Sequence, residues 1–186
     1  ETIQEHTTGE VSESIVKHFD YDEYARRLRT TTTTIGSTTT ITENTYNELG
    51  QLESKGIDEV ATDQYLINTT YNYNIRGWMT QMANTDQSGG NLFTLDLGYN
   101  QGNDPQYNGN ITQLDWTSQK QTGENYYDFT YDEINRLKTA YYNGASDGNY
   151  STAYDYDDNG NINQLTRYGL LEDKTTKDVI DNLTYK

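Results

Sequence analysis

The sequence predicts an all-β fold in which repeated β-hairpins form one continuous antiparallel sheet. Three observations support this prediction. The chain contains 18 Tyr, many Thr and a single Pro, and Tyr and Thr favour half-buried pleated surfaces. A short motif built on Tyr and Asp or Asn recurs along the chain. Around it, apolar and polar residues alternate with the two-residue period of a strand. Because one hairpin buries little surface, neighbouring repeats are expected to pair edge to edge.

The recurring motif is a strand that ends in Tyr, followed by Asp or Asn, a polar or Gly-containing turn, and Leu, Ile or Met. It reads FDYDEYARRL (19–28), NTYNELGQL (44–52), YNYNIRGWM (71–79), FTYDEINRL (129–137) and YDYDDNGNI (154–162). With a variant copy and a final partial one, the anchors are Tyr21, Tyr46, Tyr73, Tyr107, Tyr131, Tyr156 and Tyr185, at intervals of 25, 27, 34, 24, 25 and 29 residues. We therefore divide the chain into an N-terminal segment outside the clear repeats (1–18) and a repeat array (19–186).

The turns separate strands whose faces can be assigned from the alternation. Before one turn, Tyr127, Phe129 and Tyr131 are predicted to share a face, and after it Leu137, Thr139 and Tyr141 are predicted to alternate again. The apolar residue after the turn follows most anchors by six positions but follows Tyr21 by seven, as Leu28. The motif is therefore expected to tolerate small slips.

Other segments also predict strands. Residues 30–42 are interpreted as two Thr-rich strands around a turn at Gly36 and Ser37, and the pair Asn108 and Gly109 is a hairpin signal. Residues 45–60 come closest to an amphipathic helix, but two glycines interrupt them. No long helix is therefore expected.

Charge and composition exclude several functions. The net charge of −16 argues against a nucleic-acid partner, and the one basic cluster, Arg26, Arg27 and Arg29, is interpreted as solvated strand residues. No apolar run approaches the roughly 20 residues of a membrane helix. The absence of Cys excludes disulfides and thiol catalysis. The chain begins at Glu1 without Met or a signal peptide, so we expect an excised or processed piece. High acidity, richness in Asn, Thr and Tyr and the absence of Cys favour a secreted or surface-exposed bacterial protein.

The motifs resemble the YD-repeat, or Rhs-repeat, family. FTYDEINRLKTAYY and YDYDDNGNINQLTRY are similar to its signature of Tyr-Asp, a short turn with Gly or Asn, Arg or Asn, and Leu or Ile. The resemblance covers most of residues 19–186, and it rests on recurrence rather than on any single copy. The stretch 73–116 resembles a variant found in cell-surface YD proteins that Gram-negative bacteria export by the type IX route.

The resemblance implies a β-sheet that spirals into a hollow shell. In the family such shells enclose a C-terminal polymorphic toxin or the cytotoxic domain of an insecticidal complex, other members are wall-associated surface proteins, and teneurins use the shell in adhesion. The implied partners are the rest of the parent chain, with further repeats and a toxin domain, and an export machinery, with no nucleic acid and no membrane insertion. This chain is too short for a whole shell, and it shows neither the closing segment nor a toxin. Only the shell-forming role is carried over.

Residue types give little support for catalysis, so we expect no enzyme, no catalytic residues and no cofactor. The only histidines are His6 and His18, and no nucleophile turn or phosphate-binding loop is recognised. Carboxylates are plentiful, as a glycosidase requires, but they lie in turns and on exposed strand faces where both members of a pair stay ionised.

Carbohydrate binding is the alternative function, in an adhesive β module. Trp78 and Trp116 follow similar turns and could present flat rings to a sugar, with Asn and Asp supplying hydrogen bonds. The favoured interpretation is that both rings pack within the protein, as large aromatic side chains usually do.

No metal site is expected, although YDYDDNGNINQL (154–165) resembles half of an EF-hand loop. Asp155, Asp157, Asn159 and Gly160 match positions 1, 3, 5 and 6, but position 12 is Thr166 instead of a bidentate acid. We interpret the segment as a turn centred on Asp158, Asn159 and Gly160, with Ile162 beginning the return strand.

Overall fold

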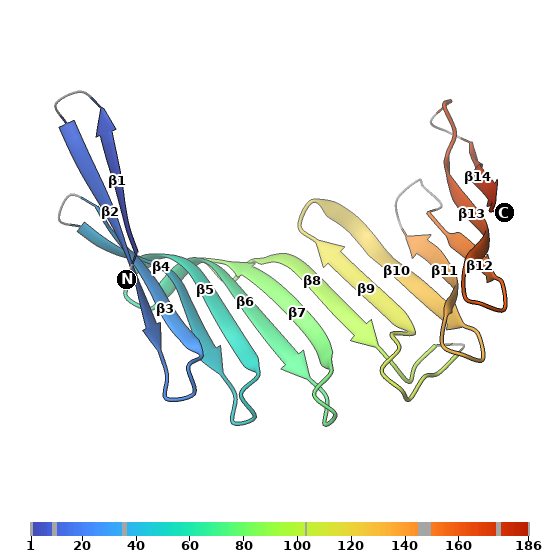
Figure 1. The fold of residues 1–186 in the computed structure, drawn as a ribbon, viewed down its shortest axis with the longest axis horizontal. Coiled ribbons are helices and arrows are strands. Elements are labelled where there is room, and N and C mark those ends of the chain that lie inside the picture. The colour runs from blue at the N-terminus through green and yellow to red at the C-terminus, as the bar shows by residue number, and fades with distance from the viewer. Residues whose placement is uncertain are drawn as a thin grey trace. The chain divides into compact units, whose positions relative to one another are not determined.

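The computed structural model describes residues 2–8, 11–34, 37–102, 104–144, 150–173 and 176–185. Within these ranges the chain forms fourteen strands that follow one another in one open sheet in chain order (Figure 1). They are β1 (Thr2–Thr8), β2 (Val11–Tyr21), β3 (Arg27–Thr34), β4 (Ser37–Tyr46), β5 (Leu52–Ala61), β6 (Gln64–Tyr73), β7 (Met79–Asp86), β8 (Asn91–Gly98), β9 (Gln113–Ser118), β10 (Gln121–Tyr131), β11 (Leu137–Gly144), β12 (Thr152–Tyr156), β13 (Ile162–Leu170) and β14 (Lys177–Thr184). The predicted all-β, antiparallel fold is confirmed.

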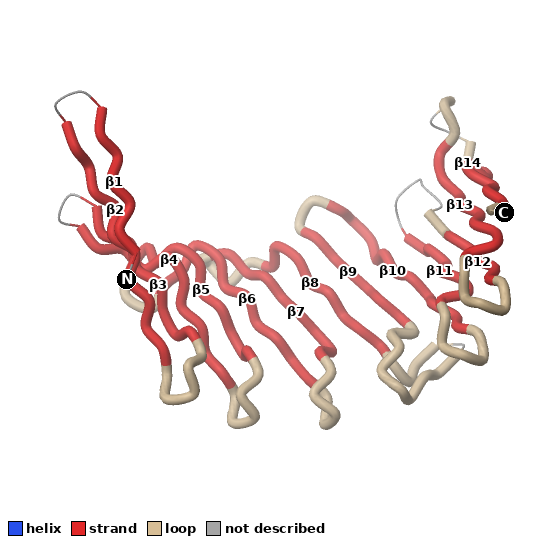
Figure 2. Tube along the Cα trace, in the orientation of Figure 1, coloured by secondary structure: helices blue, strands red, loops and turns tan. Residues whose placement is uncertain are grey.

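The described part of the chain consists of strands and connecting loops (Figure 2). No helix in these ranges has the length and apolar character needed to cross a bilayer. The chain divides into two compact units, Glu1–Phe93 and Thr94–Lys186.

In the first unit, the motif turns lie along one edge of the sheet. They connect β2 to β3, β4 to β5 and β6 to β7, and Figure 1 shows them side by side along the lower edge of the view. This arrangement follows from topology, because in an antiparallel sheet every second connection returns to the same edge. The turn between β7 and β8 lies at the opposite edge. In the second unit, two motif turns connect β10 to β11 and β12 to β13.

The pairing around Tyr131 shows which residues of the return strand share its aromatic face. Tyr127 pairs with Tyr142 and Phe129 with Ala140, whereas Tyr141 lies opposite Asp128. Ala140 and Tyr142 therefore share the face of Phe129 and Tyr127, and Thr139 and Tyr141 lie on the other face. A bulge between Thr130 and Tyr131 shifts the register by one residue and so sets which residues of the return strand share the aromatic face.

The predicted slip after Tyr21 is wrong. Tyr21 pairs with Arg27, the residue six positions later, as the other motif tyrosines pair with their apolar partners. Arg27 takes the place of the apolar residue, and its guanidinium carbon lies 4.8 Å from the centre of the Phe19 ring. The spacing of six residues from Tyr21 to its pairing partner is therefore the same as at Tyr46, and only the type of residue at the partner position differs.

The remaining predicted elements have mixed outcomes. Two Thr-rich strands, β3 and β4, are present in the segment 30–42, but Gly36 of the predicted turn lies outside the described residues. Asn108 and Gly109 lie in the loop between β8 and β9, in which Gly109 has a φ of 103°. Tyr107 lies in this loop too and is 66% exposed, so its place as a repeat anchor stays a prediction.

The core is thin because the sheet is a single layer. Among the described residues, the buried hydrophobic side chains are Tyr65, Tyr99, Ala140 and Tyr142. In the second unit they are supplemented by ring contacts across strands, with centroids 5.8 Å apart for Trp116 and Tyr127 and 5.2 Å apart for Tyr127 and Tyr142. Stability therefore depends mainly on half-buried cross-strand pairs.

Candidate functional site: the junctions between repeats

Each motif turn is built around the Asp or Asn that follows the anchor Tyr. In the turn 132–136, Oδ1 of Asp132 accepts hydrogen bonds from the backbone N–H of Ile134 (3.0 Å) and of Arg136 (2.9 Å). The backbone N–H of Asp132 donates to the carbonyl of Arg136 at 2.9 Å, which closes the turn. Equivalent side-chain contacts occur at Asp22, Asn47, Asn74 and Asp157. The side chain thus replaces the backbone partners that the bend removes.

The fourth residue of every motif turn has a left-handed backbone. The φ values are 61° at Ala25, 78° at Gly50, 80° at Gly77, 67° at Asn135 and 88° at Gly160. Glycine and asparagine reach this region at little cost, which explains why they dominate the position. The first turn departs from this rule by placing an alanine there.

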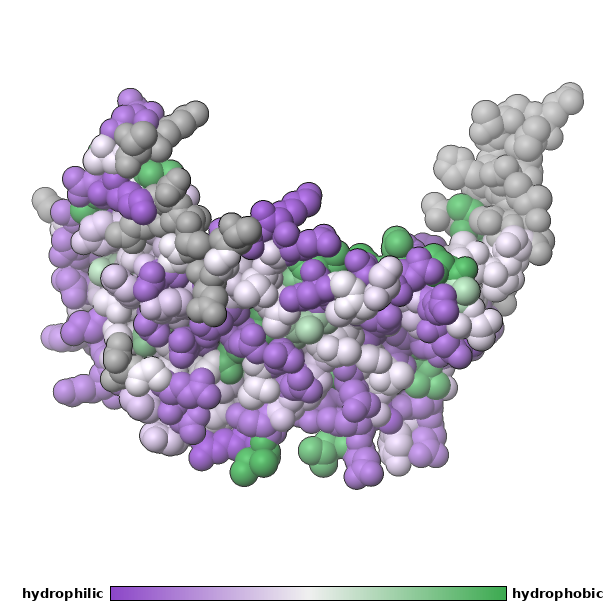
Figure 3. Space-filling model, turned by 180° about the vertical axis from the view of Figure 1, so that it is seen from behind, coloured by the Kyte–Doolittle hydropathy of each residue, from purple (hydrophilic) through white to green (hydrophobic). Residues whose placement is uncertain are grey.

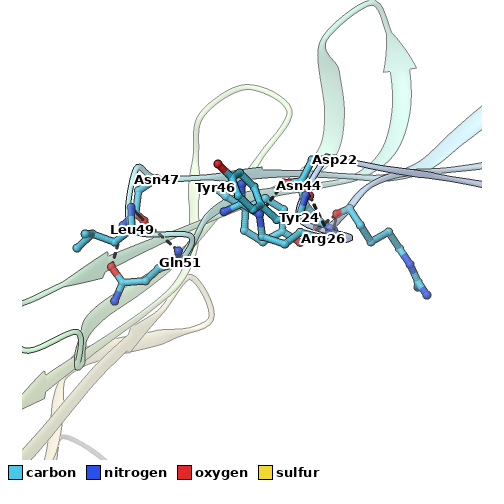
Figure 4. Close-up of polar contacts among 9 residues, drawn as sticks. Asp22, Tyr24, Arg26, Asn44, Tyr46, Asn47, Leu49 and Gln51 are labelled. Carbon is cyan, nitrogen blue, oxygen red and sulfur yellow. Dashed lines mark hydrogen bonds and ion pairs between the residues drawn. The ribbon is translucent and has the colours of Figure 1, made fainter.

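The anchor tyrosines connect each repeat to the preceding one. The Tyr46 hydroxyl donates to the carbonyl oxygen of Arg27, the first residue of β3, at 3.0 Å, and Figure 4 shows Tyr46 and Asn44 beside the turn Asp22–Arg26. The amide of Asn44 donates to the same oxygen at 2.9 Å. The same hydroxyl contact joins Tyr73 to Leu52 (2.8 Å), Tyr131 to Ile111 (2.7 Å) and Tyr156 to Leu137 (2.7 Å).

The fifth residue of the turn makes a second connection, this time to the following repeat. The guanidinium carbon of Arg26 lies 4.7 Å from the centre of the Tyr46 ring, and that of Arg136 lies 4.5 Å from the centre of the Tyr156 ring. Arg136 also donates to the carbonyl of Asp157 at 3.0 Å. Where the fifth residue is Gln51, its amide donates to the carbonyl of Gly77 at 3.2 Å. A cation–π contact at such sites contributes about 0.5–1 kcal/mol.

The loop between β8 and β9 makes comparable contacts with the turn 132–136. A carboxylate oxygen of Asp104 accepts from the backbone N–H of Tyr131 at 3.2 Å, and the amide of Asn108 donates to Oδ1 of Asn135 at 2.5 Å. This loop therefore occupies the neighbouring position that a motif turn occupies elsewhere.

The ionisable groups of the junctions are held in the forms that these contacts need. Burial raises the pKa of the Tyr73, Tyr131 and Tyr156 phenols, which keeps them neutral and able to donate. Burial also raises the pKa of Asp132, but hydrogen bonds from the backbone and side chain of Arg136 outweigh it and lower the pKa below its ordinary value. At Asp157, hydrogen bonds from the side chain and backbone of Asn161 lower the pKa.

The residues predicted for sugar binding lie in different units. Trp78 is the fifth residue of its turn, and the guanidinium carbon of Arg76 lies 5.1 Å from its ring centre. Trp116, on β9, stacks on Tyr127 with planes 20° apart. Both side chains are half-buried and have neighbours from their own unit. Their binding of a ligand stays a prediction.

The EF-hand-like segment is a motif turn. Oδ1 of Asp157 accepts from the backbone N–H of Asn159 and of Asn161, and Oδ2 accepts from the Asn161 side chain at 2.9 Å. The turn spans Asp158, Asn159 and Gly160 as predicted, and Ile162 begins β13, but the side chain that supports the bend is that of Asp157. In the part of the chain that the structure describes, no three His, Cys, Asp or Glu residues lie close enough together to hold a metal ion.

His18 and the basic cluster lie on β2, β3 and the turn between them. Nε2 of His18 lies 3.5 Å from Oδ1 of Asp20, with 58% of its side chain exposed, and His6 lies on β1. Within the cluster, Arg26 pairs with Asp22 at 2.5 Å and Arg29 with Glu43 at 2.7 Å. These arginines are therefore engaged by carboxylates of their own repeats.

Sequence reasoning missed the targets of the anchor hydroxyls. It predicted that strands end in an anchor tyrosine, but not that the phenols of Tyr46, Tyr73, Tyr131 and Tyr156 donate to carbonyls 19 to 21 residues earlier. It also missed that Gly56 makes room for Tyr65. A Cβ on Gly56 would lie 2.5 Å from the Tyr65 ring, which crosses the glycine to bring its hydroxyl to Glu43. The signal that could have revealed the junction is the Arg or Gln at the fifth turn position.

The fold is similar to part of a solved toxin structure. No family model and no curated protein matches the chain. A structure of the Photorhabdus luminescens Tc holotoxin pore, carrying a mutation in TccC3, matches with a TM-score of 0.65 at 16% identity and covers 90% of this chain. This likeness shows the fold alone.

The chain spans 8% of the length of that toxin chain. A crystal structure of TcdB2-TccC3 matches with a TM-score of 0.42 at 11% identity, covering 92% of this chain and 11% of that one. A porin-like protein from Bacteroides uniformis matches with a TM-score of 0.36 at 10% identity, covering 97% and 93%. Neither of these two similarities is close enough to carry an argument.

Proposed function

We propose that this chain is a non-enzymatic structural segment of a larger secreted or cell-surface bacterial protein of the YD-repeat type, in which its sheet forms part of a shell wall. The observation that carries the proposal is the repeated junction, in which an anchor tyrosine donates to the preceding repeat. Such junctions extend a sheet in one direction without requiring a globular core. The fold similarity to the Tc holotoxin structure supports the same role.

In the parent protein this wall would separate a C-terminal toxin or effector from its surroundings until delivery. The acidic chain, with a net charge of −16, keeps a broad single-layer sheet soluble and discourages association with other sheets. The export machinery that carries the parent protein out of the cell would be its other partner.

Two experiments test the proposal. Far-UV circular dichroism of the isolated chain should show mainly strand, and a helical or disordered spectrum would contradict the fold on which the proposal depends. In the parent protein, limited proteolysis should leave the segment C-terminal to the repeats intact. A parent with Tyr46, Tyr73, Tyr131 and Tyr156 all changed to Phe should be cleaved in that segment sooner than the unchanged parent. Equal protection in both proteins would argue against an enclosing wall.

A second candidate is an adhesive carbohydrate-binding module, which would use the parts of the Trp78 and Trp116 rings that packing leaves exposed. A glycan array distinguishes the two. Saturable binding that is lost in Trp78→Ala and Trp116→Ala would support this module, and absence of binding would leave the wall as the function.

A further inference from the structure

Exposed apolar side chains project from three successive motif turns of the first unit. The exposed fractions are 71% for Tyr24, 80% for Leu49 and 103% for Ile75, and we call these three residues the turn-tip row. Each lies at the second or third position of its turn, at the same edge of the sheet. In the space-filling view, apolar side chains protrude between hydrophilic ones along the lower edge (Figure 3).

The turn itself does not require apolar residues at these positions. The turn 157–161 makes the same backbone contacts with Asp158 and Asn159 at its tip. The turn at the opposite edge, which is closed by Asp86, carries Gln87 and Ser88 there. Because polar tips fold equally well, three consecutive apolar tips expose surface that folding alone does not explain.

The spacing of the row suits one kind of partner. Successive motif turns are two strands apart, which places their tips about 10 Å from each other. Residues seven apart on one face of an α-helix are separated by about 10.5 Å along its axis. The second and third turns also enclose a groove of about 320 Å³ lined by Leu49, Ile75, Tyr71 and Tyr73. A helix lying across the turns could therefore place one apolar side chain at each tip.

Charge selects among partners of this shape. Glu23 and Glu48 are exposed beside the first two tips, Arg76 is exposed beside the third, and Glu53 lines the groove. A second copy of the chain would bring its own −16 charge to the same edge, and three side chains fall well short of the roughly 1,200 Å² that a stable dimer buries. A partner with basic residues meets the two tip carboxylates instead.

We propose that the turn-tip row binds an amphipathic α-helix of a partner protein, with apolar residues seven positions apart and Lys or Arg beside them. This surface is independent of the wall function, because it uses the outer side of the turns and not the junctions between repeats. The mode resembles the general recognition of an amphipathic helix through spaced apolar anchors.

The test uses a synthetic helical peptide of about 21 residues with Leu at every seventh position and Lys beside each Leu. Titration into the full chain, followed by fluorescence anisotropy, should saturate. The triple variant Tyr24→Asn, Leu49→Asn, Ile75→Asn keeps the net charge and should bind at least about tenfold more weakly. Ile134→Asn, at an exposed tip of the second unit, is the matched control and should leave binding unchanged.

A peptide of the same composition with its Leu residues scrambled around the helix serves as the second control. Equal binding of both peptides, unchanged binding in the triple variant, or no saturation up to about 1 mM would each overturn the proposal. If the triple variant loses its strand spectrum, the pair Glu23→Lys and Glu48→Lys replaces it. The double variant should no longer bind the peptide with Lys beside its Leu residues, and it should bind a peptide with Glu in their place. The opposite result would also overturn the proposal.

Discussion

The hydroxyl group of the anchor tyrosine is the smallest part of the repeat that reaches its neighbour. At Tyr73 it donates to the carbonyl of Leu52, and burial raises the pKa of the phenol so that its proton is retained. The ring and the hydroxyl therefore have separable roles. The ring packs within the sheet, and the hydroxyl adds a side-chain connection between two neighbouring hairpins.

Tyr73→Phe should lower the free energy of unfolding by about 1 kcal/mol, because it removes one hydrogen bond while keeping the ring. Urea unfolding followed by circular dichroism measures the change. Tyr24→Phe is the control, since this residue is 71% exposed, and it should change the free energy by less than about 0.5 kcal/mol. Equal effects at the two sites would show that the junction hydroxyl contributes nothing particular.

The turn carboxylates should make the protein sensitive to acid. The pKa of Asp157 is lowered from 3.8 by hydrogen bonds from Asn161, so its ionised form is favoured in the folded state. A lowered folded pKa gives stability that is present above pH 3.8 and is lost as the pH falls through the folded value.

Asp157→Asn should therefore flatten the fall in melting temperature below about pH 4. The turn itself should survive, because Asn47 and Asn74 support the same contacts in their own turns. Asp158→Asn removes the same charge from the exposed tip of this turn, and a melting profile changed as much by this control would contradict the assignment.

At the scale of the element, the five-residue turn fixes both the bend and the register. Its left-handed fourth residue produces a bulge beside the anchor tyrosine, as between Thr130 and Tyr131 and between Asn72 and Tyr73. The side chains of the return strand are therefore displaced by one position relative to simple alternation. The turn thus decides which face of the sheet each return strand presents.

Exchanging residues at the left-handed position should change stability in opposite directions. Ala25→Gly should stabilise the chain, since it removes about 1–2 kcal/mol of backbone strain and costs somewhat less in unfolded-state entropy. Gly160→Ala should destabilise it by about 1 kcal/mol, because the added Cβ meets nothing closer than 3.9 Å and only the backbone is strained. Thermal unfolding of both variants tests the pair, and shifts of the same sign would contradict it.

The sequence was sufficient to predict the hairpins but not the contacts between them. Tyr and Asp or Asn at fixed spacing are local signals, so the turns at 47–51 and 132–136 could be located directly. The face on which Tyr142 lies could not be predicted, because it depends on a bulge between Thr130 and Tyr131 and the alternation of apolar and polar residues gives no sign of that bulge. The pairing of Tyr65 with Glu43 across Gly56 joins residues 22 positions apart, so it appears only when three strands are in register. The candidate ligand residues Trp78 and Trp116 could be proposed from their residue type alone. The side chains around them could not be predicted, because strand pairing determines them.

At the scale of the whole molecule, each described strand pairs only with the strands before and after it in the chain. Stability is therefore expected to be a sum of repeat and junction contributions. Within the first unit, β5 and β6 with their preceding turn form one complete repeat, residues 47–73.

Deleting residues 47–73 should leave a folded, shorter sheet. Tyr46 would then be followed directly by Asn74, which restores an intact motif turn, and Tyr46 would keep its acceptor on Arg27. Deleting only 47–61 would instead join two strands that run in the same direction and cannot form a hairpin. Circular dichroism and size-exclusion chromatography should show a cooperative strand signal for the first deletion. The second deletion should aggregate or lose the strand signal. Similar behaviour of the two would contradict a modular array.

The hydroxyl junctions also have a direction in time. In every one the acceptor carbonyl precedes the donor along the chain, as with Arg27 before Tyr46 and Leu137 before Tyr156. A ribosome adding about 5–20 residues per second therefore exposes each acceptor roughly one to four seconds before its donor emerges. Each new hairpin meets a finished docking edge, so the growing protein can assemble in the order in which it is made.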